Sequence, residues 1–323
     1  MNIKRIAEQC NISLSAAYKA IHHKKGVDAR TRQRVLAAAL SMGIVPRAKV
    51  GRKPTVGVVL PCTPSYYWDA LCHGLESSVP NALDAHFAFF SSMGVGRESI
   101  YAIDYMENMD ALIIAPPTMA EVKARIAVLA AEKPVICVSE GLDAPHLATI
   151  GGDYFKDGMR LGRALLQYQP NRKRILALHV HNGLGAQLRS AGFAKALEGS
   201  GVSIVDSITL EAISSPFASV IARSIKAKGI GSFDCLYCGT GVTPYASLAL
   251  CKLGLCKDVI CIGYENPPGN ATYLNSGLIR LLSISDAYEM GRCAMQLAGD
   301  WLLEKKSPAS PNIYVPSKIF VNQ

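Results

Sequence analysis

Residues 55 to 323 alternate between short apolar runs and helical patterns, and this alternation constrains the fold more than any other feature. Strands are predicted at Thr55–Leu60, His86–Ser91, Ala111–Ala115, Val135–Ser139, Arg174–His179, Cys235–Cys238 and Val259–Gly263. Helices are predicted between them at Trp68–Val79, Val122–Ala131, Asp157–Tyr168, Ala186–Glu198, Ala218–Lys228 and Thr243–Leu253. Such alternation favours doubly wound parallel sheets, and there are enough strands for two. We therefore expect an α/β body of two lobes, with a ligand cleft at the carboxyl ends of the strands.

Bulk composition limits the alternatives. The chain has 323 residues, more than one typical core, and it is 50% hydrophobic and 18% charged, which excludes disorder as the dominant state. No apolar run approaches the ~20 residues that span a bilayer. The first residues continue into an amphipathic pattern instead of a signal peptide. We expect a cytoplasmic protein with no membrane partner.

Positive charge is concentrated before residue 55. This segment holds twelve Lys and Arg residues against only Glu8 and Asp28, a net charge of +10. The rest of the chain has 22 basic and 23 acidic residues, a net charge of −1. A solvated basic face is the simplest interpretation of any charge run. Here the charge coincides with a helical motif, so nucleic acid is the first partner to consider.

Three helices are predicted within residues 3 to 46. Apolar residues at positions 3, 6, 7 and 10 lie on one face of a first helix, and Asn11 suits a sharp left-handed turn. Ser13 can cap a second helix that ends near residue 21, and Asp28 can cap a third that Gly43 ends. Two short helices joined by a tight turn and braced by a third form a helix-turn-helix. A generic three-helix bundle is the alternative, and the exposed basic residues favour DNA binding.

Several blocks of this segment resemble the headpiece of the LacI/GalR family of bacterial transcription regulators. The blocks are Ile6-Ala7-Glu8, Asn11-Ile12-Ser13, Val27-Asp28-Ala29-Arg30-Thr31-Arg32 and Gly43-Ile44-Val45-Pro46. The resemblance implies an all-α DNA-binding headpiece over residues 1–46. It also implies a set of DNA contacts: Leu14, Ser15 and Lys19 to base edges, and Tyr18, His22, Thr31 and Arg32 to phosphates or sugars. Lys19 stands where the family commonly has an Arg, and a Lys lacks the bidentate fork, so the operator sequence is expected to differ.

Residues 47–54 form a short basic connector. The family's connector is longer, folds on the operator and inserts a Leu into the minor groove. Gly51 and Pro54 disfavour a helix in so short a segment. We expect Arg47 and Lys49 to contact phosphates as a basic arm, with Val50 as the only apolar candidate for insertion between base pairs.

The body resembles the same family nearly to its end. The matching blocks include Ser65-Tyr66-Tyr67-Trp68, Asp153-Tyr154, Gly192-Phe193, Gly263-Tyr264-Glu265-Asn266 and Ile279–Ser285. The resemblance implies a body like that of periplasmic binding proteins over residues 55–323. Lobe 1 is expected to span about 55–152 and 286–308, and lobe 2 about 153–285 and 309–323.

Candidate ligand-binding residues lie next to the predicted strands. Arg189 carries a guanidinium fork that can bind hydroxyls or an anionic group, and Glu265 supplies an acceptor. Tyr67 and Trp68 can stack on a sugar ring, although two ordinary core aromatics are an equally good interpretation. Arginine, carboxylate and aromatic side chains together suit a polyhydroxy ligand that is bound without reaction.

Two further candidates depart from the family pattern. Ser139 and Thr240 stand where the family usually has longer hydrogen-bonding side chains. The resemblance then implies a less acidic pocket, which suits a phosphorylated sugar or a ligand that is not a sugar, or else weak or no effector binding.

Cysteine usage gives little sign of special chemistry. The ten cysteines are expected to serve as small buried hydrophobic residues in a reducing compartment. Cys235 and Cys238 form a C-x-x-C inside a predicted strand, where an offset of three points the side chains to opposite faces. A shared metal or a redox role is therefore disfavoured.

Enzyme motifs are incomplete. Gly183-Leu184-Gly185 hints at a phosphate loop, but Leu188 occupies the third glycine position of the fingerprint. His179 and His181 share a strand face without a third ligand at a recognisable spacing. We therefore predict no catalytic residue, cofactor or metal.

The leading hypothesis is a ligand-responsive transcription regulator, most simply a repressor. It would bind a near-palindromic DNA operator as a homodimer, because two-fold protein symmetry imposes such a site, and sense a small-molecule effector. One alternative is a solute-binding module of transport type. Another is an enzyme that acts on sugar phosphates and is fused to a DNA-binding head.

Overall fold

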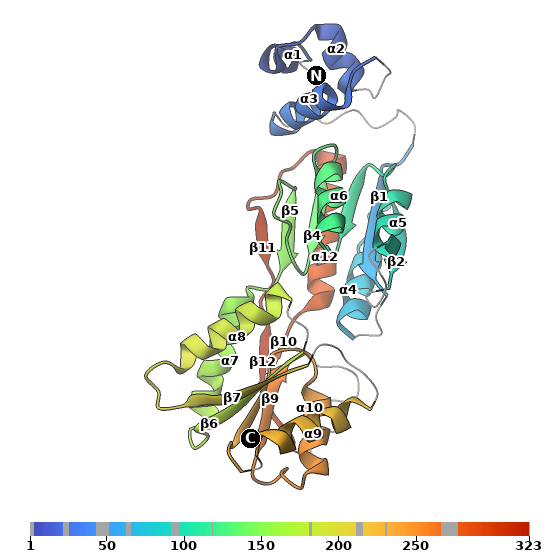
Figure 1. Ribbon diagram of the computed structural model, residues 1–323. Coiled ribbons are helices and arrows are strands. Elements are labelled where there is room, and N and C mark those ends of the chain that lie inside the picture. The colour runs from blue at the N-terminus through green and yellow to red at the C-terminus, as the bar shows by residue number, and fades with distance from the viewer. Residues whose placement is uncertain are drawn as a thin grey trace. The chain divides into compact units, whose positions relative to one another are not determined.

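The computed structural model describes residues 3–21, 26–42, 52–62, 66–91, 97–117, 119–180, 183–210, 216–229, 231–265 and 277–322 (Figure 1). The chain divides into two compact units. The first unit comprises Met1–Thr63, Leu71–Ile150 and Met290–Ile313, and the second comprises Pro64–Ala70, Gly151–Glu289 and Tyr314–Gln323. Unlike the expected lobes, residues 64–70 and 286–289 group with the second unit and residues 309–313 with the first.

Three helices precede the first sheet: α1 (Ile3–Cys10), α2 (Leu14–Ile21) and α3 (Ala29–Ser41). Their shared core includes Ile6, Ile21 and Val35, which are fully buried. The predicted left-handed turn at Asn11 is confirmed, with a φ of 51°. Both predicted caps are confirmed as well. The Ser13 hydroxyl accepts a hydrogen bond from the backbone N–H of residue 16 at 3.1 Å, and the Asp28 carboxylate accepts one from that of residue 31 at 2.8 Å.

The first unit contains most of a six-stranded sheet with the order β11-β5-β4-β3-β1-β2. Its elements are β1 (Thr55–Pro61), α4 (Tyr66–Glu76), β2 (Asp84–Phe90), α5 (Arg97–Tyr105), β3 (Ala111–Ile114), α6 (Ala120–Ala130), β4 (Val135–Val138), β5 (Ala148–Gly151), α12 (Ala287–Gly299), the π-helical turn η1 (Asp300–Glu304) and β11 (Asn312–Tyr314). Strands β1 to β5 pair in parallel. Helices α5 and α6 cover one face of this sheet through Ile103 and Ile126, which pack on β3.

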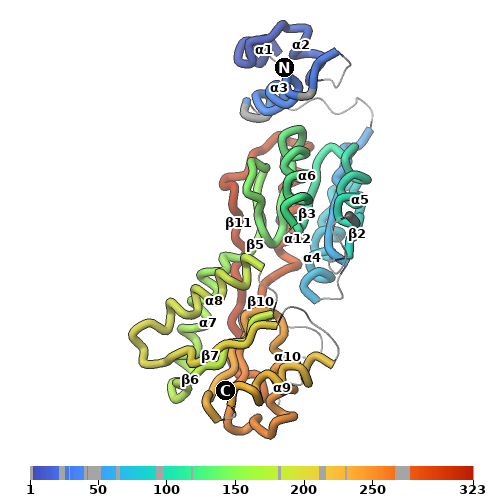
Figure 2. Tube along the Cα trace, in the orientation of Figure 1, coloured from blue at the N-terminus to red at the C-terminus, as the bar shows by residue number. Residues whose placement is uncertain are grey.

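The second unit contains the other six-stranded sheet, ordered β12-β10-β9-β8-β6-β7. Its elements are α7 (Tyr154–Tyr168), β6 (Arg174–Val180), α8 (Leu184–Leu197), β7 (Ser203–Leu210), α9 (Phe217–Lys228), β8 (Cys235–Cys238), α10 (Thr243–Lys252), β9 (Ile260–Tyr264), β10 (Ile279–Ile284) and β12 (Lys318–Val321). All pairs are parallel except β10 with β12. Helices α7 and α8 pack on one face, and α9 and α10 on the other. Figure 2 lets the reader follow the red C-terminal trace from α12 through β11 into β12.

Helices α7 and α8 approach each other closely because glycines face each other. A Cβ added at Gly158 would lie 2.0 Å from the carbonyl oxygen of Arg189, and one at Gly192 would lie 2.0 Å from that of Phe155. Both distances are impossible contacts, so each position requires glycine at this separation. Phe193, next to Gly192, stacks on Tyr237 of β8 with ring centroids 4.1 Å apart. This packing fixes the position of Arg189 above the sheet.

The strands and helices predicted after residue 54 are confirmed in place, although the structure contains more elements than the sequence predicted. All seven predicted strands are present within two residues at each end, and the six predicted helices within three. The prediction omitted the helices α5 and α12, the turn η1 and the strands β5, β7, β10, β11 and β12. Except for the buried strand β10, these strands are short or carry exposed side chains along most of their length, as in β7 and β11.

The cysteine prediction is partly wrong. Five cysteines are buried as free thiols, namely Cys10, Cys137, Cys235, Cys238 and Cys261, and burial raises the pKa of Cys137 to about 12. However, Cys62 is exposed, and Cys251 and Cys256 form a disulfide that joins the end of α10 to the following turn. Among the helices in the described part of the chain, none has both the length and the apolarity that crossing a bilayer needs.

Candidate functional site

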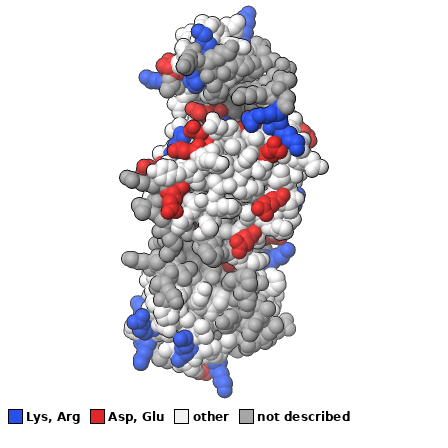
Figure 3. All heavy atoms as spheres, turned by 90° about the vertical axis from the view of Figure 1, so that its right-hand side faces the viewer, with Lys and Arg blue, Asp and Glu red and all other residues white. Residues whose placement is uncertain are grey.

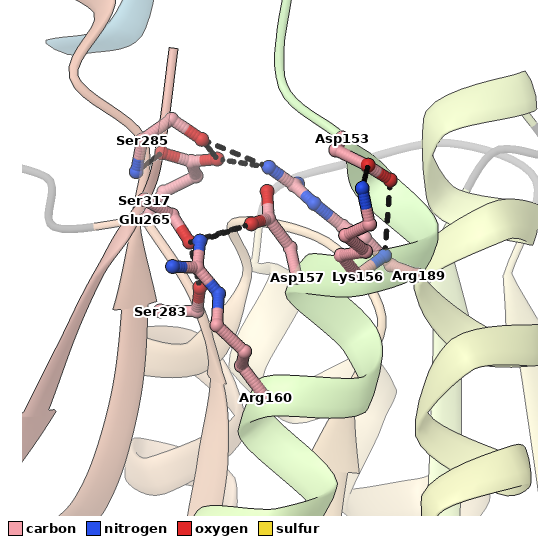
Figure 4. A network of polar contacts seen from close by, with 9 residues as sticks. All are labelled: Asp153, Lys156, Asp157, Arg160, Arg189, Glu265, Ser283, Ser285 and Ser317. Atoms are coloured by element: carbon pink, nitrogen blue, oxygen red, sulfur yellow. Dashed lines mark hydrogen bonds and ion pairs between the residues drawn. The ribbon is translucent and has the colours of Figure 1, made fainter. Parts of the chain in front are cut away.

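A buried arginine lies at the centre of the candidate site in the second unit. Arg189, in the second turn of α8, is 9% exposed. Its Nη2 donates hydrogen bonds to Oε1 of Glu265 at 2.8 Å and to Oγ of Ser285 at 3.0 Å (Figure 4). The guanidinium carbon lies 4.4 Å from the ring centroid of Tyr264 and 4.9 Å from that of Tyr154. One cation is thus held by a carboxylate, a hydroxyl and two aromatic rings.

The topology of the second sheet brings these residues together. Glu265 directly follows β9, and Ser285 directly follows β10, its parallel neighbour. Carboxyl ends of adjacent parallel strands lie at the same edge of a sheet. Glu265 and Ser285 therefore meet Arg189 there, although they follow it in the sequence by 76 and 96 residues. Glu265 also has a φ of 63°, a left-handed conformation that costs about 1–3 kcal/mol for a non-glycine residue. Strain of this size at a strand end is typical of functional sites.

Electrostatics keeps Arg189 protonated. Burial opposes its charge, but the Glu265 carboxylate and the tyrosines Tyr154 and Tyr264 outweigh that effect, so the pKa of Arg189 is raised from its ordinary value. Burial also raises the pKa of the Tyr264 hydroxyl. The Nε of Arg189 and the hydroxyl of Tyr264 are buried and have no hydrogen-bond partner in the described part of the chain. These two atoms leave donor capacity inside the cluster.

The loop after β8 adds Thr240 to this edge of the sheet. A Cβ built on Gly241 would lie 3.3 Å from Cβ of Glu265, and one on Gly239 would lie 3.0 Å from Nδ1 of His179. The two glycines therefore let the loop approach both side chains closely. The Thr240 hydroxyl is buried without a hydrogen-bond partner among the described residues. The structure thus gathers three predicted ligand-binding residues, Arg189, Thr240 and Glu265, within the second unit.

The other predicted ligand-binding residues lie elsewhere in the chain. Tyr67 and Trp68, in the first turn of α4, are half-buried and contact each other edge to face with centroids 5.0 Å apart. Ser139 follows β4 in the first unit and has a φ of 69°. Strand β4 is third in the order of the first sheet, as β9 is in the second. Ser139 and Glu265 are therefore equivalent strand-end positions, and both have left-handed backbones.

A second polar network lies beside Arg189 (Figure 4). Asp157 of α7 is 1% exposed, and its Oδ1 accepts hydrogen bonds from Nη2 of Arg160 at 2.6 Å and from Oγ of Ser317 at 2.7 Å. The hydroxyl of Ser283 donates to Ser317 at 3.0 Å. The network ties α7 to β10 and to the segment before β12. Sequence reasoning missed its members, and it also missed Tyr154, Tyr264 and Ser285 around Arg189.

The predicted DNA-contacting residues of α2 are solvent-exposed. Leu14 is 56% exposed, Tyr18 is 42% exposed, and Ser15 and Lys19 are exposed as well. Thr31 and Arg32 of α3 are half-buried. Figure 3 shows Lys and Arg side chains at several points on the three-helix segment. The remaining predicted contacts lie outside the described residues: His22, Arg47, Lys49 and Val50.

The end of the connector is tied to the first unit. Nη2 of Arg52 lies 3.0 Å from Oδ2 of Asp110, which also accepts hydrogen bonds from the backbone N–H and the hydroxyl of Thr55. Nζ of Lys53 lies 3.8 Å from Oδ1 of Asp84. Two of the basic residues that precede β1 are therefore paired with acidic residues of the body.

Within the described ranges, no three side chains of His, Cys, Asp or Glu are grouped so that they could hold a metal ion. Cys235 and Cys238 belong to core clusters on opposite faces of the second sheet, as the strand offset predicted. His181 lies outside the described residues, and His179 is half-buried, which lowers its pKa.

Residues 56–306 match the family described as the periplasmic binding protein domain. The chain belongs to this family. A curated relative in Bacillus subtilis (strain 168), the uncharacterised HTH-type transcriptional regulator YkvZ, is 23% identical over 204 residues. That alignment covers 61% of each protein, so the chain matches about three fifths of the relative's length.

Several solved structures have the same two-sheet fold as this member of the periplasmic binding protein domain family. The glucose-galactose binding protein GanP from Geobacillus stearothermophilus is 19% identical with a TM-score of 0.74, over 84% of this chain and 98% of that one. A periplasmic ribose ABC transporter protein from Conexibacter woesei has a TM-score of 0.74 at 17% identity, over 85% and 94%. A candidate LacI transcriptional regulator from Bacteroides fragilis has a TM-score of 0.69 at 18% identity, over 84% and 98%. At these identities the likeness concerns the fold alone.

Proposed function

We propose that this protein is a ligand-responsive, DNA-binding transcription regulator. Helices α1 to α3 form its helix-turn-helix headpiece, and the two α/β units form its sensor. One observation carries the proposal: two different parts occur in the same chain. The first is a capped three-helix module in a segment of net charge +10, and the second is a body that belongs to the periplasmic binding protein domain family. The regulator YkvZ and the candidate LacI regulator support this combination.

DNA recognition is assigned to the exposed side of α2. Leu14, Ser15 and Lys19 face base edges in the major groove, and Tyr18 contacts the backbone. The protein acts as a homodimer in the cytoplasm and represses transcription from a near-palindromic operator. Two-fold symmetry of the dimer would then place one headpiece on each half-site.

The effector is a sugar-like small molecule. Arg189 donates to its hydroxyl groups or to a phosphate, and Glu265 accepts from a hydroxyl. The hydroxyl of Thr240, which has no partner among the described residues, supplies a further hydrogen bond. The protein binds this effector without turnover. The glucose-galactose and ribose binding proteins of the same fold support a polyhydroxy ligand.

A solute-binding role without DNA is the second candidate. It is favoured by the number of transporter binding proteins among the structural relatives, including proteins with bound D-allose and D-arabinose. This role leaves the charged three-helix segment without a function. If the protein did not bind DNA, the solute-binding role would be favoured.

The test is to select binding sites for the full-length protein from random duplex DNA, and then to repeat the selection with a panel of sugars and sugar phosphates. We expect enrichment of one near-palindromic sequence, and one class of compound that changes its occupancy. An Arg189→Ala variant should bind the same sequence but lose the response to the compound. Absence of any enriched sequence, together with tight binding of a sugar, would favour the solute-binding role.

A further inference from the structure

The second unit has a surface pocket of about 480 Å³ that does not include Arg189 or Glu265. One wall is the outer face of α7, and the opposite wall is the segment Tyr314–Pro316. Its volume lies within the range of about 300–1,000 Å³ that small-molecule sites commonly have. The pocket is not explained by the proposed function, and its chemistry differs from that of the Arg189 site.

The helical wall carries a stripe of three cations. Lys156, Arg160 and Arg163 are spaced by four and three residues, so they share one face of α7. Lys156 pairs with Asp153 at 2.7 Å, and Arg160 pairs with Asp157 at 2.6 Å. These pairs neutralise two of the three cations.

Arg163 is the uncompensated charge of the pocket. It is exposed, and within the described part of the chain it has neither an ion pair nor a hydrogen bond. Arg160, one turn away, has a side chain that is 40% exposed, and among the described residues its only hydrogen bonds run from Nη2 to Asp157 and to Ser317, which leaves Nη1 for a ligand. The two guanidinium groups therefore offer hydrogen-bond donors to an anionic group, and one positive charge remains in the pocket after the two ion pairs are counted.

The opposite wall is apolar. It is formed by Val315, which is 5% exposed, by Pro316 and by Tyr314, which is 58% exposed. Met159 of α7 contributes a flexible thioether between the cations. A fully hydrated inorganic ion would gain nothing from these surfaces, whereas an apolar body attached to the anion would bury them.

We propose that this pocket is a second ligand site, and that it takes a small organic acid with an apolar body and one phosphate or carboxylate group. The anion lies against Arg163 and the free edge of Arg160, and the body lies against Tyr314 and Pro316. Residues 314–316 are where the chain passes from the first unit into the second. A ligand there contacts this segment directly, through residues that differ from Arg189, Thr240 and Glu265.

The test uses phenyl phosphate as the probe and the full-length protein, with binding followed by ligand-observed NMR and calorimetry. We expect saturable binding to the wild type that Arg163→Ala weakens by about tenfold, the factor that corresponds to one lost charge-assisted hydrogen bond. Arg163→Glu should abolish binding. Inorganic phosphate and benzyl alcohol should each bind more weakly than phenyl phosphate, because each lacks one half of the recognised chemistry.

Two variants locate the probe. Arg223→Ala removes an exposed arginine from α9 in the same unit, so it should leave binding of phenyl phosphate unchanged. Glu265→Gln alters the Arg189 site, and protein of this variant that urea unfolding shows to be folded should also bind phenyl phosphate as the wild type does. The inference is overturned if the wild type does not bind the probe at millimolar concentration, if Arg163→Ala binds it normally, or if folded Glu265→Gln protein does not bind it. None of these outcomes depends on whether the protein binds DNA.

Discussion

Arg189 and Glu265 form an ion pair at 2.8 Å, with side chains that are only 11% and 14% exposed. The pair joins helix α8 to the end of strand β9. Removal of one partner leaves the other charge buried without a counter-charge. The resulting loss in the free energy of unfolding is larger than the net contribution of the intact pair.

We therefore expect Glu265→Ala to destabilise the second unit by about 3 kcal/mol, the low end for a broken buried pair. The double variant Arg189→Met/Glu265→Ala should recover most of that loss, because no buried charge remains. Urea unfolding measures both values. As a control, Glu198→Ala removes an exposed pair with Lys195 on the same helix and should cost less than about 1 kcal/mol. Equal losses at Glu265 and Glu198 would contradict the buried-pair account.

The contact between α7 and α8 gives a second prediction. A methyl group at residue 192 meets the backbone of Phe155, which cannot give way as a side chain could. Gly192→Ala should therefore separate the helices and destabilise the second unit by roughly 1–3 kcal/mol, the usual cost of overpacking. It should also weaken effector binding, because Arg189 lies on α8. Ala194→Ser adds an atom to an exposed position of α8 and should change neither stability nor binding. A fully stable Gly192→Ala protein would show that the two helices are not in this contact.

His179 gives a pH prediction. Burial lowers the pKa of His179 in the folded protein below the value of about 6.5 expected in an unfolded chain. Between the two pKa values the unfolded state binds more protons, so stability is complete above about pH 6.5 and falls as the pH drops toward the folded pKa. Urea unfolding at several pH values should show this loss, and His179→Gln should reduce its slope. A slope that is unaltered in His179→Gln would assign the acid sensitivity to other groups.

Lys19 gives a prediction about specificity. Its side chain is exposed on α2, the helix that we assign to the major groove. If Lys19 contacts a base, Lys19→Ala should change which sites are enriched from random DNA, and the change should be confined to one position in each half-site. If it contacts only phosphate, the variant should bind the same sites uniformly more weakly. The enriched sequences of the two proteins distinguish these outcomes.

The sequence could predict the buried framework because its signals are local. Strands such as β1 and β8 are continuous apolar runs, and the caps Ser13 and Asp28 act within three residues of their own positions. The strand β7 was missed because most of its side chains are exposed, as on the edge of a sheet, so no apolar pattern marks it.

The candidate site was only partly predictable. Glu265 was found because it directly follows a predicted strand, and Arg189 because it lies early in the helix after another, where a charged residue stands out from an apolar background. The partners of these side chains depend on contacts between distant parts of the chain. Arg189 reaches Ser285 across 96 residues, and Asp157 reaches Ser317 across 160, and neither serine has a distinctive sequence context. The same holds for the rings of Tyr154 and Tyr264, which flank Arg189 from two different elements.

The most direct test of a DNA-binding regulator is the affinity of the full-length protein for its selected duplex as a function of salt. Lys and Arg contacts to phosphates release counterions, so the logarithm of the binding constant should fall linearly with the logarithm of salt concentration. For six to ten phosphate contacts the loss is about 10³–10⁵ between about 50 and 200 mM salt. A scrambled duplex should bind more weakly at every salt concentration. Binding that is insensitive to salt, or equal for the selected and scrambled duplexes, would contradict the account.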